Sequence, residues 1–246
     1  MKILLVTSDL TYAPENYNNV FEYVTSNASQ HLVGVVIVKI NKFSVLAKVP
    51  YLYFAGCNNM SNTLIRNLAD ASSGRKRKFL AALKIPFIFA NSINDAQTIA
   101  WLNSMKPDLI LNMRARCIYK EAVLQIPQLG CVNVHHGILP SQKGLFCDLY
   151  ALADDKKAGF TIHQMTNGID QGSIFRTQEA DKNKNYIDYL TEVASKEKQA
   201  IVKFIENVVQ NNSLPESKPN QKQKSFFTTT PNFKKIKELR HKGIIL

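Results

Sequence analysis

The chain has 246 residues, a formal net charge of +12 and 45% hydrophobic residues. A chain of this length can bury a large core without covalent cross-links, so one large domain, or one domain with a small appendage, is expected. Its cysteines, Cys57, Cys117, Cys131 and Cys147, form no Cys-x-x-Cys pair, which indicates reduced thiols in a cytoplasmic protein. The longest apolar run, residues 32–38, is far too short to span a membrane.

Short apolar runs alternate with helical patterns over the first 135 residues. The predicted strands are residues 1–8, 31–39, 86–90, 108–112 and 130–135. The predicted helices are residues 17–26, 61–71, 79–83, 95–105 and 120–125. This alternation predicts an α/β fold, with a mostly parallel sheet and helices on both faces. The sequence has no Gly-x-Gly and no Walker A motif, so dinucleotide binding and P-loop phosphoryl transfer are disfavoured.

The character of the chain changes after residue 179. Residues 189–209 have apolar side chains at helical spacing, and residues 211–224 are polar and are expected to form a linker or long loop. We therefore divide the chain into a catalytic domain, residues 1–180, and a small C-terminal extension, residues 181–246. The tail from residue 226 mixes basic and aromatic residues and ends in Ile244-Ile-Leu246, which favours docking on the domain over nucleic-acid binding.

The high positive charge has two interpretations. A basic surface attracts anions such as nucleic acid, nucleotide sugars or phosphates, but a lysine-rich solvated surface would give the same composition. The basic cluster Arg75-Lys-Arg-Lys78 follows Ser72-Ser-Gly74, so we expect a solvated loop there.

The candidate site consists of Asn133, His135 and Asp170. Asn133 and His135 are two positions apart on a predicted strand, so their side chains point to the same face. Asp170 follows in the glycine-flanked Asn167-Gly-Ile-Asp-Gln-Gly172. A carboxamide can stabilise an oxyanion, an imidazole can move a proton, and a carboxylate can orient or charge the imidazole. The combination suits acyl transfer.

Each of these residues also has a structural interpretation. A lone histidine among apolar residues is usually part of a core, and an aspartate beside glycines often stabilises a turn. His136 would point away from His135 if the strand continued, so we expect a structural or rim position for it. Adjacent histidines lack the spacing of a helical zinc motif, and no metal is expected.

The same region resembles the folate-dependent formyltransferases. The resemblance lies in Asn133-x-His135, in the Leu139-Pro140 that follows, and in Gly159-Phe-Thr-Ile-His163 seven residues before Asp170. It extends over roughly residues 1–180 and is strongest between residues 107 and 175. The family transfers a formyl group from N10-formyltetrahydrofolate to primary amines. The resemblance thus implies a Rossmann-like fold, this folate as formyl donor, and catalytic roles for Asn133, His135 and Asp170.

In this family the pterin ring of the folate is bound mainly by backbone groups on two loops. By resemblance, one of these loops is Arg116-Cys117-Ile118-Tyr119 and the other is the segment that leads to Asp170. The implied cofactor-binding residues are Cys117, Ile118, Tyr119 and His163, and whether His163 lines the cleft or faces the core is left open. Two departures bear on the acceptor. Lys143 stands where the family often has an arginine, and Asp9–Pro14 replaces a small-residue phosphate loop, which argues against a glycinamide ribonucleotide acceptor.

The expected function is formyl transfer to the primary amine of a small anionic acceptor, with an amino sugar nucleotide as the first choice. Formylation of aminoacyl-tRNA, which would use the +12 charge, is a less favoured alternative. Hydrolysis of formyltetrahydrofolate and a non-catalytic nucleotide- or RNA-binding role are further alternatives. No membrane partner is expected, and the oligomeric state is left open, with a homodimer among the choices.

Overall fold

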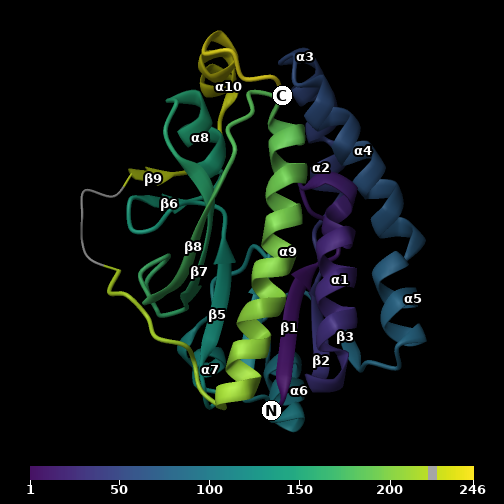
Figure 1. Cartoon of the computed structure of the whole chain (residues 1–246). Helices are drawn as coiled ribbons and strands as arrows, with labels where there is room; N and C mark the ends of the chain where they lie inside the picture. Colours follow the sequence, from purple (N-terminus) through teal and green to yellow (C-terminus); the bar gives the residue numbers. More distant parts are fainter. Residues whose placement is uncertain (221–225) are drawn as a thin grey trace.

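The computed structural model describes residues 1–220 and 226–246. Its main sheet has the strand order β3-β2-β1-β4-β5-β7-β8 (Figure 1). The strands are β1 (Ile3–Ser8), β2 (Leu32–Val38), β3 (Phe87–Ala90), β4 (Leu109–Met113), β5 (Cys131–His135), β7 (Ala158–Gln164) and β8 (Ile174–Ala180). β1 to β5 run parallel, and β7 and β8 are antiparallel. The mostly parallel sheet predicted from the sequence is confirmed.

Helices pack on both faces of this sheet. The helices of the described residues are α1 (Asn18–Ala28), α2 (Lys42–Leu46), α3 (Lys48–Phe54), α4 (Asn58–Ser73), α5 (Arg75–Ala82), α6 (Ala96–Met105), α7 (Glu121–Leu124), α8 (Cys147–Ala153), α9 (Tyr186–Asn211) and α10 (Phe233–His241). Short 3-10 turns, η1 (Pro14–Tyr17) and η2 (Ser29–His31), flank α1. Among the described residues, no helix is both long enough and apolar enough to cross a membrane.

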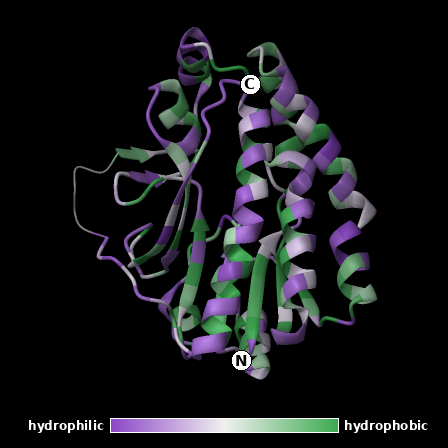
Figure 2. Cartoon of the chain, viewed as in Figure 1, coloured by the Kyte–Doolittle hydropathy of each residue, from purple (hydrophilic) through white to green (hydrophobic). Residues whose placement is uncertain are grey.

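Alternate residues of β1 belong to two cores. Ile3 and Leu5 pack with apolar residues of α1 and α9, whereas Leu4 and Val6 pack with residues of α6 and α7. This follows from the two-residue period of a strand, and it explains why central strands covered on both faces are apolar throughout. Figure 2 shows β1 and β5 mostly in the colours of hydrophobic residues, whereas hydrophilic and hydrophobic residues alternate along the helices.

The strand order reverses between β1 and β4. From β1 the chain proceeds outward to β2 and β3, and it then returns to place β4 and β5 on the other side of β1. In such sheets, ligands bind at the carboxyl ends of the strands beside this reversal. The segments that follow β1, β4 and β5 meet there.

The C-terminal tail docks on the domain, as its apolar residues predict. Ile236, Leu239, Ile244 and Leu246 are buried in the same core as α1 and α9. A short strand, β9 (Phe226–Thr228), pairs with β6 (Gln142–Gly144) in a second, two-stranded sheet. The predicted linker comprises residues 211–224, and its last part, residues 221–224, lies outside the described residues.

One expectation about local structure was wrong, and two helices were not predicted. The basic cluster at residues 75–78 forms the start of α5, because Gly74 in a left-handed conformation (φ 71°) ends α4 and lets a new helix begin at once. Lys76 is buried there, and its Nζ donates to the carbonyl oxygens of Ser8 and Asn16, each at 3.0 Å. α2 and α3 were not predicted, since between them they bury only Val45 and so lack an apolar periodicity.

Candidate active site

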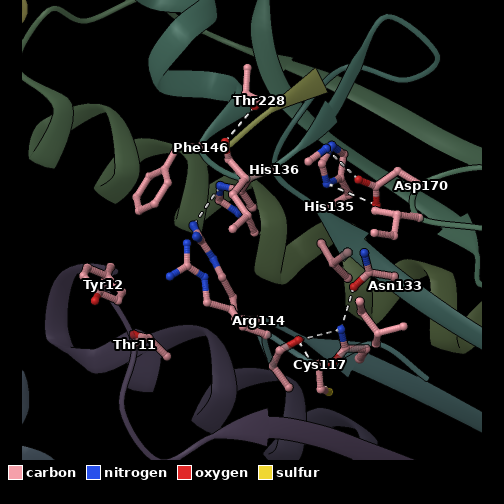
Figure 3. Close-up of a pocket in the computed structure, with 18 of the residues that line it drawn as sticks. Thr11, Tyr12, Arg114, Cys117, Asn133, His135, His136, Phe146, Asp170 and Thr228 are labelled. Carbon is pink, nitrogen blue, oxygen red and sulfur yellow. Dashed lines mark hydrogen bonds and ion pairs between the residues drawn. The ribbon is translucent and has the colours of Figure 1, made fainter. Parts of the chain in front are cut away.

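A cavity of about 550 Å³ lies at the carboxyl edge of the sheet. Its walls come from the segments after β1, β4 and β5, from the loop before β8, and from β9. Every site residue predicted from the sequence lines it: Asn133, His135, Asp170, Cys117, Ile118, Tyr119 and His163. Figure 3 shows Asn133, His135 and Asp170 on one side of this cavity.

The carboxamide of Asn133 is oriented by its neighbour on β4. Asn112 pairs with Asn133 in the sheet, and its Nδ2 donates to Oδ1 of Asn133 at 2.8 Å. The amide nitrogen of Asn133 is thereby directed away from β4, 3.2 Å from Nε2 of His163. One of its two N–H groups can bond to His163, and the other is left to donate to a reacting group.

The tautomer of His135 follows from its contacts. Its Nε2 lies 2.8 Å from the carbonyl oxygen of Gln142, which can only accept, so Nε2 carries a proton. Nδ1 is then the atom that can gain or lose a proton, and it lies 3.6 Å from Oδ1 of Asp170. A carboxylate at this distance stabilises the imidazolium that forms when Nδ1 takes a proton.

His163 lies next to His135 and is neutral. Its Nδ1 donates to the carbonyl oxygen of Gln164 at 2.8 Å, so Nε2 has the free lone pair that accepts from Asn133. Burial, followed by the charge of His135, lowers the pKa of His163 to about 4. Nε2 is also 3.6 Å from Oδ1 of Asp170. The sequence left the orientation of His163 open, and in the structure it lines the cavity.

Asp170 is positioned by a strand that is itself held by the tail. The backbone of Asp170 is left-handed (φ 51°), and its Oδ2 accepts from the backbone N–H of Gly144 on β6 at 2.9 Å. β6 pairs with β9, and the added Cβ of any other residue at Gly144 would lie 2.1 Å from the carbonyl oxygen of Thr228. The aspartate therefore does more than stabilise its own turn, because it links the loop before β8 to β6.

The titration of His163 gives a testable pH dependence of stability. In the unfolded chain its pKa returns towards 6.5, so below that pH the unfolded state binds a proton that the folded state excludes. Folding stability should therefore fall as the pH falls from 6.5 to about 4, by roughly 3 kcal/mol from this residue. Urea unfolding across this range should show a shallower decline for His163→Phe than for the natural chain. The exposed His241→Phe variant is the control, and equal declines in all three proteins would contradict this assignment.

The expectation for His136 was only partly right. β5 ends at His135, so the alternation of side chains stops there, and His136 lines the cavity together with His135. Its Nε2 lies 3.0 Å from Oε2 of Glu197, and its Nδ1 lies 3.2 Å from Oδ2 of Asp148. Burial and Arg114 lower the pKa of His136, but the two carboxylates outweigh them and leave it raised. His136 thus belongs to a buried charged network behind the cavity wall.

The predicted folate loop has both apolar and polar features. Ile118 is 64% exposed, and its carbonyl oxygen accepts from Nδ2 of Asn94 at 2.8 Å. Burial raises the pKa of the Cys117 thiol to about 12, so it is protonated at neutral pH and is a poor nucleophile. Tyr119 is buried, and its hydroxyl has no hydrogen-bond partner within the described part of the chain.

Sequence reasoning missed several cavity residues. Asn112 could have been found as the one polar residue in the predicted strand after Asp108, at the strand end that parallel pairing brings beside Asn133. Arg114 precedes the predicted folate loop and Arg116 is its first residue, but no motif gave either side chain a role. Thr228 comes from the tail, and no local pattern indicates that it reaches the site.

Fold and site together define a class: Rossmann-like α/β proteins with a carboxamide donor and a proton-accepting imidazole at the carboxyl edge of the sheet, suited to acyl transfer. A model of the formyl transferase family matches residues 65–205, which is more than half of the chain. The chain belongs to the formyl transferase family.

Individual relatives cover parts of the chain. Over 108 residues it is 36% identical to the bifunctional polymyxin resistance protein ArnA of Wigglesworthia glossinidia brevipalpis, a match that covers 42% of this chain and 16% of that protein. Over 132 residues it is 29% identical to the methionyl-tRNA formyltransferase of Thermotoga maritima, covering 52% of this chain and 42% of the relative. The matched part of the chain thus spans less than half the length of either relative.

Solved structures show the same fold over almost the whole chain. A sugar N-formyltransferase from Shewanella sp. FDAARGOS_354 aligns with a TM-score of 0.60 and 17% identity, covering 93% of this chain and 77% of that one. A phosphoribosylglycinamide formyltransferase from Anaplasma phagocytophilum aligns with a TM-score of 0.62 and 14% identity, covering 94% and 99%. At these identities the likeness concerns the fold alone.

Proposed function

We propose that this protein transfers a formyl group from N10-formyltetrahydrofolate to the primary amine of a small anionic acceptor, with a nucleotide-linked amino sugar as the best candidate. The observation that carries the proposal is the cluster of Asn133, His135, His163 and Asp170 on one wall of the cavity. Membership of the formyl transferase family supports the reaction class.

The residues present fit a folate. The cavity volume, about 550 Å³, lies within the range of pockets that hold drug-sized molecules. Ile118 and Ile169 line it and are 64% and 45% exposed, so they offer apolar surface for a planar ring to cover. Within the described residues, Oδ1 of Asn112 and the hydroxyl of Tyr119 are buried without a hydrogen-bond partner. Both residues belong to the cavity wall.

The chemistry then follows from the orientation of the side chains. The bound folate supplies an activated formyl carbon. The free N–H of Asn133 donates to the formyl oxygen, on which negative charge develops as the amine attacks. Nδ1 of His135 takes the proton that the amine loses, and Asp170 stabilises the resulting charge at 3.6 Å. The proton ends on the folate nitrogen as its bond to the formyl carbon breaks. His163 keeps the amide of Asn133 in place.

Folate binding is the direct test of this proposal. Titration of the protein with 5-formyltetrahydrofolate, followed by calorimetry, should give saturable binding. A bulky, charged residue on the apolar surface should weaken it, so we expect at least tenfold lower affinity for Ile118→Asp. Leu46→Asp, which alters an exposed apolar residue of α2 away from the predicted folate loop, serves as the control. Absence of binding at millimolar folate would reject the proposal.

A second candidate acceptor is aminoacyl-tRNA. It is favoured by the methionyl-tRNA formyltransferases among the relatives and by the net charge of +12. A screen of amines with N10-formyltetrahydrofolate, which follows release of tetrahydrofolate, separates the candidates. Release only with an amino sugar nucleotide supports the first acceptor, release only with aminoacyl-tRNA supports the second, and release without any amine indicates a hydrolase.

A further inference from the structure

The wall of the cavity opposite the catalytic residues is cationic. Lys48, Arg114 and Arg116 line it, and none of them forms an ion pair with a carboxylate in the described part of the chain. Figure 3 shows Arg114 between Tyr12 and His136, across the cavity from Asp170. The cavity therefore has a catalytic side and a positive side, which is the arrangement expected for an acceptor that carries its amine and its negative charge at different ends.

Arg114 is held in place by its neighbours, and one of its N–H groups forms no hydrogen bond within the described residues. Its backbone is left-handed (φ 64°), a conformation that costs energy for a residue with a side chain. One terminal nitrogen, Nη2, lies 2.7 Å from Nδ1 of His136, and the guanidinium carbon lies 5.5 Å from the ring centre of Tyr17. Its Nε is buried and has no hydrogen-bond partner within the described residues. A buried donor without a partner costs free energy, so this conformation of Arg114 is maintained by its surroundings.

Arg116 and Lys48 are placed at the mouth of the cavity by aromatic rings. The guanidinium of Arg116 lies between Tyr12 and Phe146, 5.1 and 4.8 Å from their ring centres. Nζ of Lys48 donates to the hydroxyl of Tyr12 at 3.3 Å. Cation–π contacts fix the position of a guanidinium without neutralising it, so its N–H groups can still bind an anion.

The charge near this wall leaves a positive excess. The two nearby carboxylates, Asp148 and Glu197, are occupied: both contact His136, and they also accept from the hydroxyls of Tyr186 and Tyr17 respectively. The charge of Arg114 acts on both carboxylates and helps to lower their pKa values, so Arg114 is itself partly compensated by them. Lys48 and Arg116 then contribute two positive charges that no carboxylate compensates. A diphosphate group has the matching charge and many acceptor oxygens.

We propose that Arg114, Arg116 and Lys48 bind the diphosphate of a nucleotide-linked acceptor and thereby direct its amine towards Asn133 and His135. This assignment deepens the proposed function and rests on it. In this proposal the segment after β4 has two functions. Its arginines, Arg114 and Arg116, bind the acceptor, and the residues that follow them, Cys117, Ile118 and Tyr119, contact the folate. Arginine suits this role because its planar fork makes two parallel hydrogen bonds to a phosphate.

The test is a calorimetric titration with UDP and dTDP, with uridine and thymidine as phosphate-free probes and inorganic pyrophosphate as a base-free probe. We expect the diphosphates to bind and the nucleosides to bind at least tenfold more weakly. Arg116→Met and Lys48→Met should each weaken diphosphate binding about tenfold, and Arg114→Lys should weaken it despite the retained charge. Arg176→Met is the matched control, since this exposed arginine on β8 donates to Gln178 at 3.1 Å, away from the cavity.

The outcomes separate this inference from the proposed function, because each variant is also titrated with 5-formyltetrahydrofolate. If folate binds and the diphosphates bind equally to the natural chain and to Arg116→Met and Lys48→Met, the diphosphate site is rejected and formyl transfer stands. If pyrophosphate and both nucleoside diphosphates fail to bind while aminoacyl-tRNA does, the assignment is likewise overturned. Loss of folate binding in the natural chain would reject the proposed function itself. Arg116 and Lys48 lie at the cavity mouth, so their variants should fold even if Arg114→Lys does not.

Discussion

Replacing His135 with alanine is expected to lower the rate of formyl transfer by about 10²–10⁴-fold while the fold stays intact. In the proposed mechanism, Nδ1 of His135 takes the proton of the amine and Asp170, 3.6 Å away, stabilises the resulting charge, and the variant lacks both contributions. Asn133→Ala and Asp170→Ala should each lower the rate by about 10² or more, because they remove the oxyanion donor and the charge partner of His135. The measurement is tetrahydrofolate release with the acceptor found in the amine screen.

Two controls sharpen this experiment. His241→Ala removes an exposed histidine on α10 and should keep full activity. Asp170→Asn keeps an oxygen that can accept from Gly144 but loses the charge, so it separates the positioning of the loop from the stabilisation of His135. Full activity of His135→Ala, with an unchanged melting temperature, would remove this residue from the mechanism.

Replacing Glu197 with alanine is expected to destabilise the fold by about 3–5 kcal/mol. Glu197 on α9 is fully buried; its Oε2 lies 3.0 Å from Nε2 of His136, and its Oε1 accepts from the hydroxyl of Tyr17. The variant removes the partner of the buried Nε2 of His136 and the acceptor of the buried hydroxyl of Tyr17. Urea unfolding measures the change, and Glu197→Gln, which can still accept one hydrogen bond, should cost less than Glu197→Ala.

The pH dependence of this effect provides an independent check. Burial raises the pKa of Glu197, but the charge and hydrogen bond of His136 outweigh it and leave the pKa lowered. Its stabilising contribution is therefore complete above about pH 4.3, the pKa of an unfolded glutamate, and is lost as the pH falls through the folded pKa. The difference in stability between the natural chain and Glu197→Ala should shrink in acid. Glu206→Ala, an exposed position on the same helix, should change stability by less than about 0.5 kcal/mol.

The parallel sheet could be predicted because its strands are covered on both faces and are therefore apolar throughout. Asn133 and His135 could be predicted because two positions on one strand must share a face. Their relation to Asp170 came from the family resemblance, and the structure brings the residues together. Local patterns thus identified the residues that lie close in sequence on one strand.

The supporting residues could not be predicted, because they meet through distant segments. Glu197 reaches His136 across 61 residues, and Thr228 reaches Lys143 across 85. No periodicity connects such positions, since the contact depends on how α9 and the tail pack. For His136 only the direction of the side chain was misjudged, because the exact end of β5 determines whether it can reach the cavity, and strand ends are not visible in a pattern of apolar residues.

The pairing of β6 with β9 has a consequence for how the protein is made. Gly144 on β6 holds the carboxylate of Asp170, yet its pairing strand, Phe226–Thr228, is translated long after both. At about 5–20 residues per second, several seconds of synthesis separate Asp170 from Thr228. A nascent chain on the ribosome therefore contains Asn133, His135, His163 and Asp170 before the strand that pairs with β6 has been made, so the proposed catalytic arrangement is completed late in synthesis.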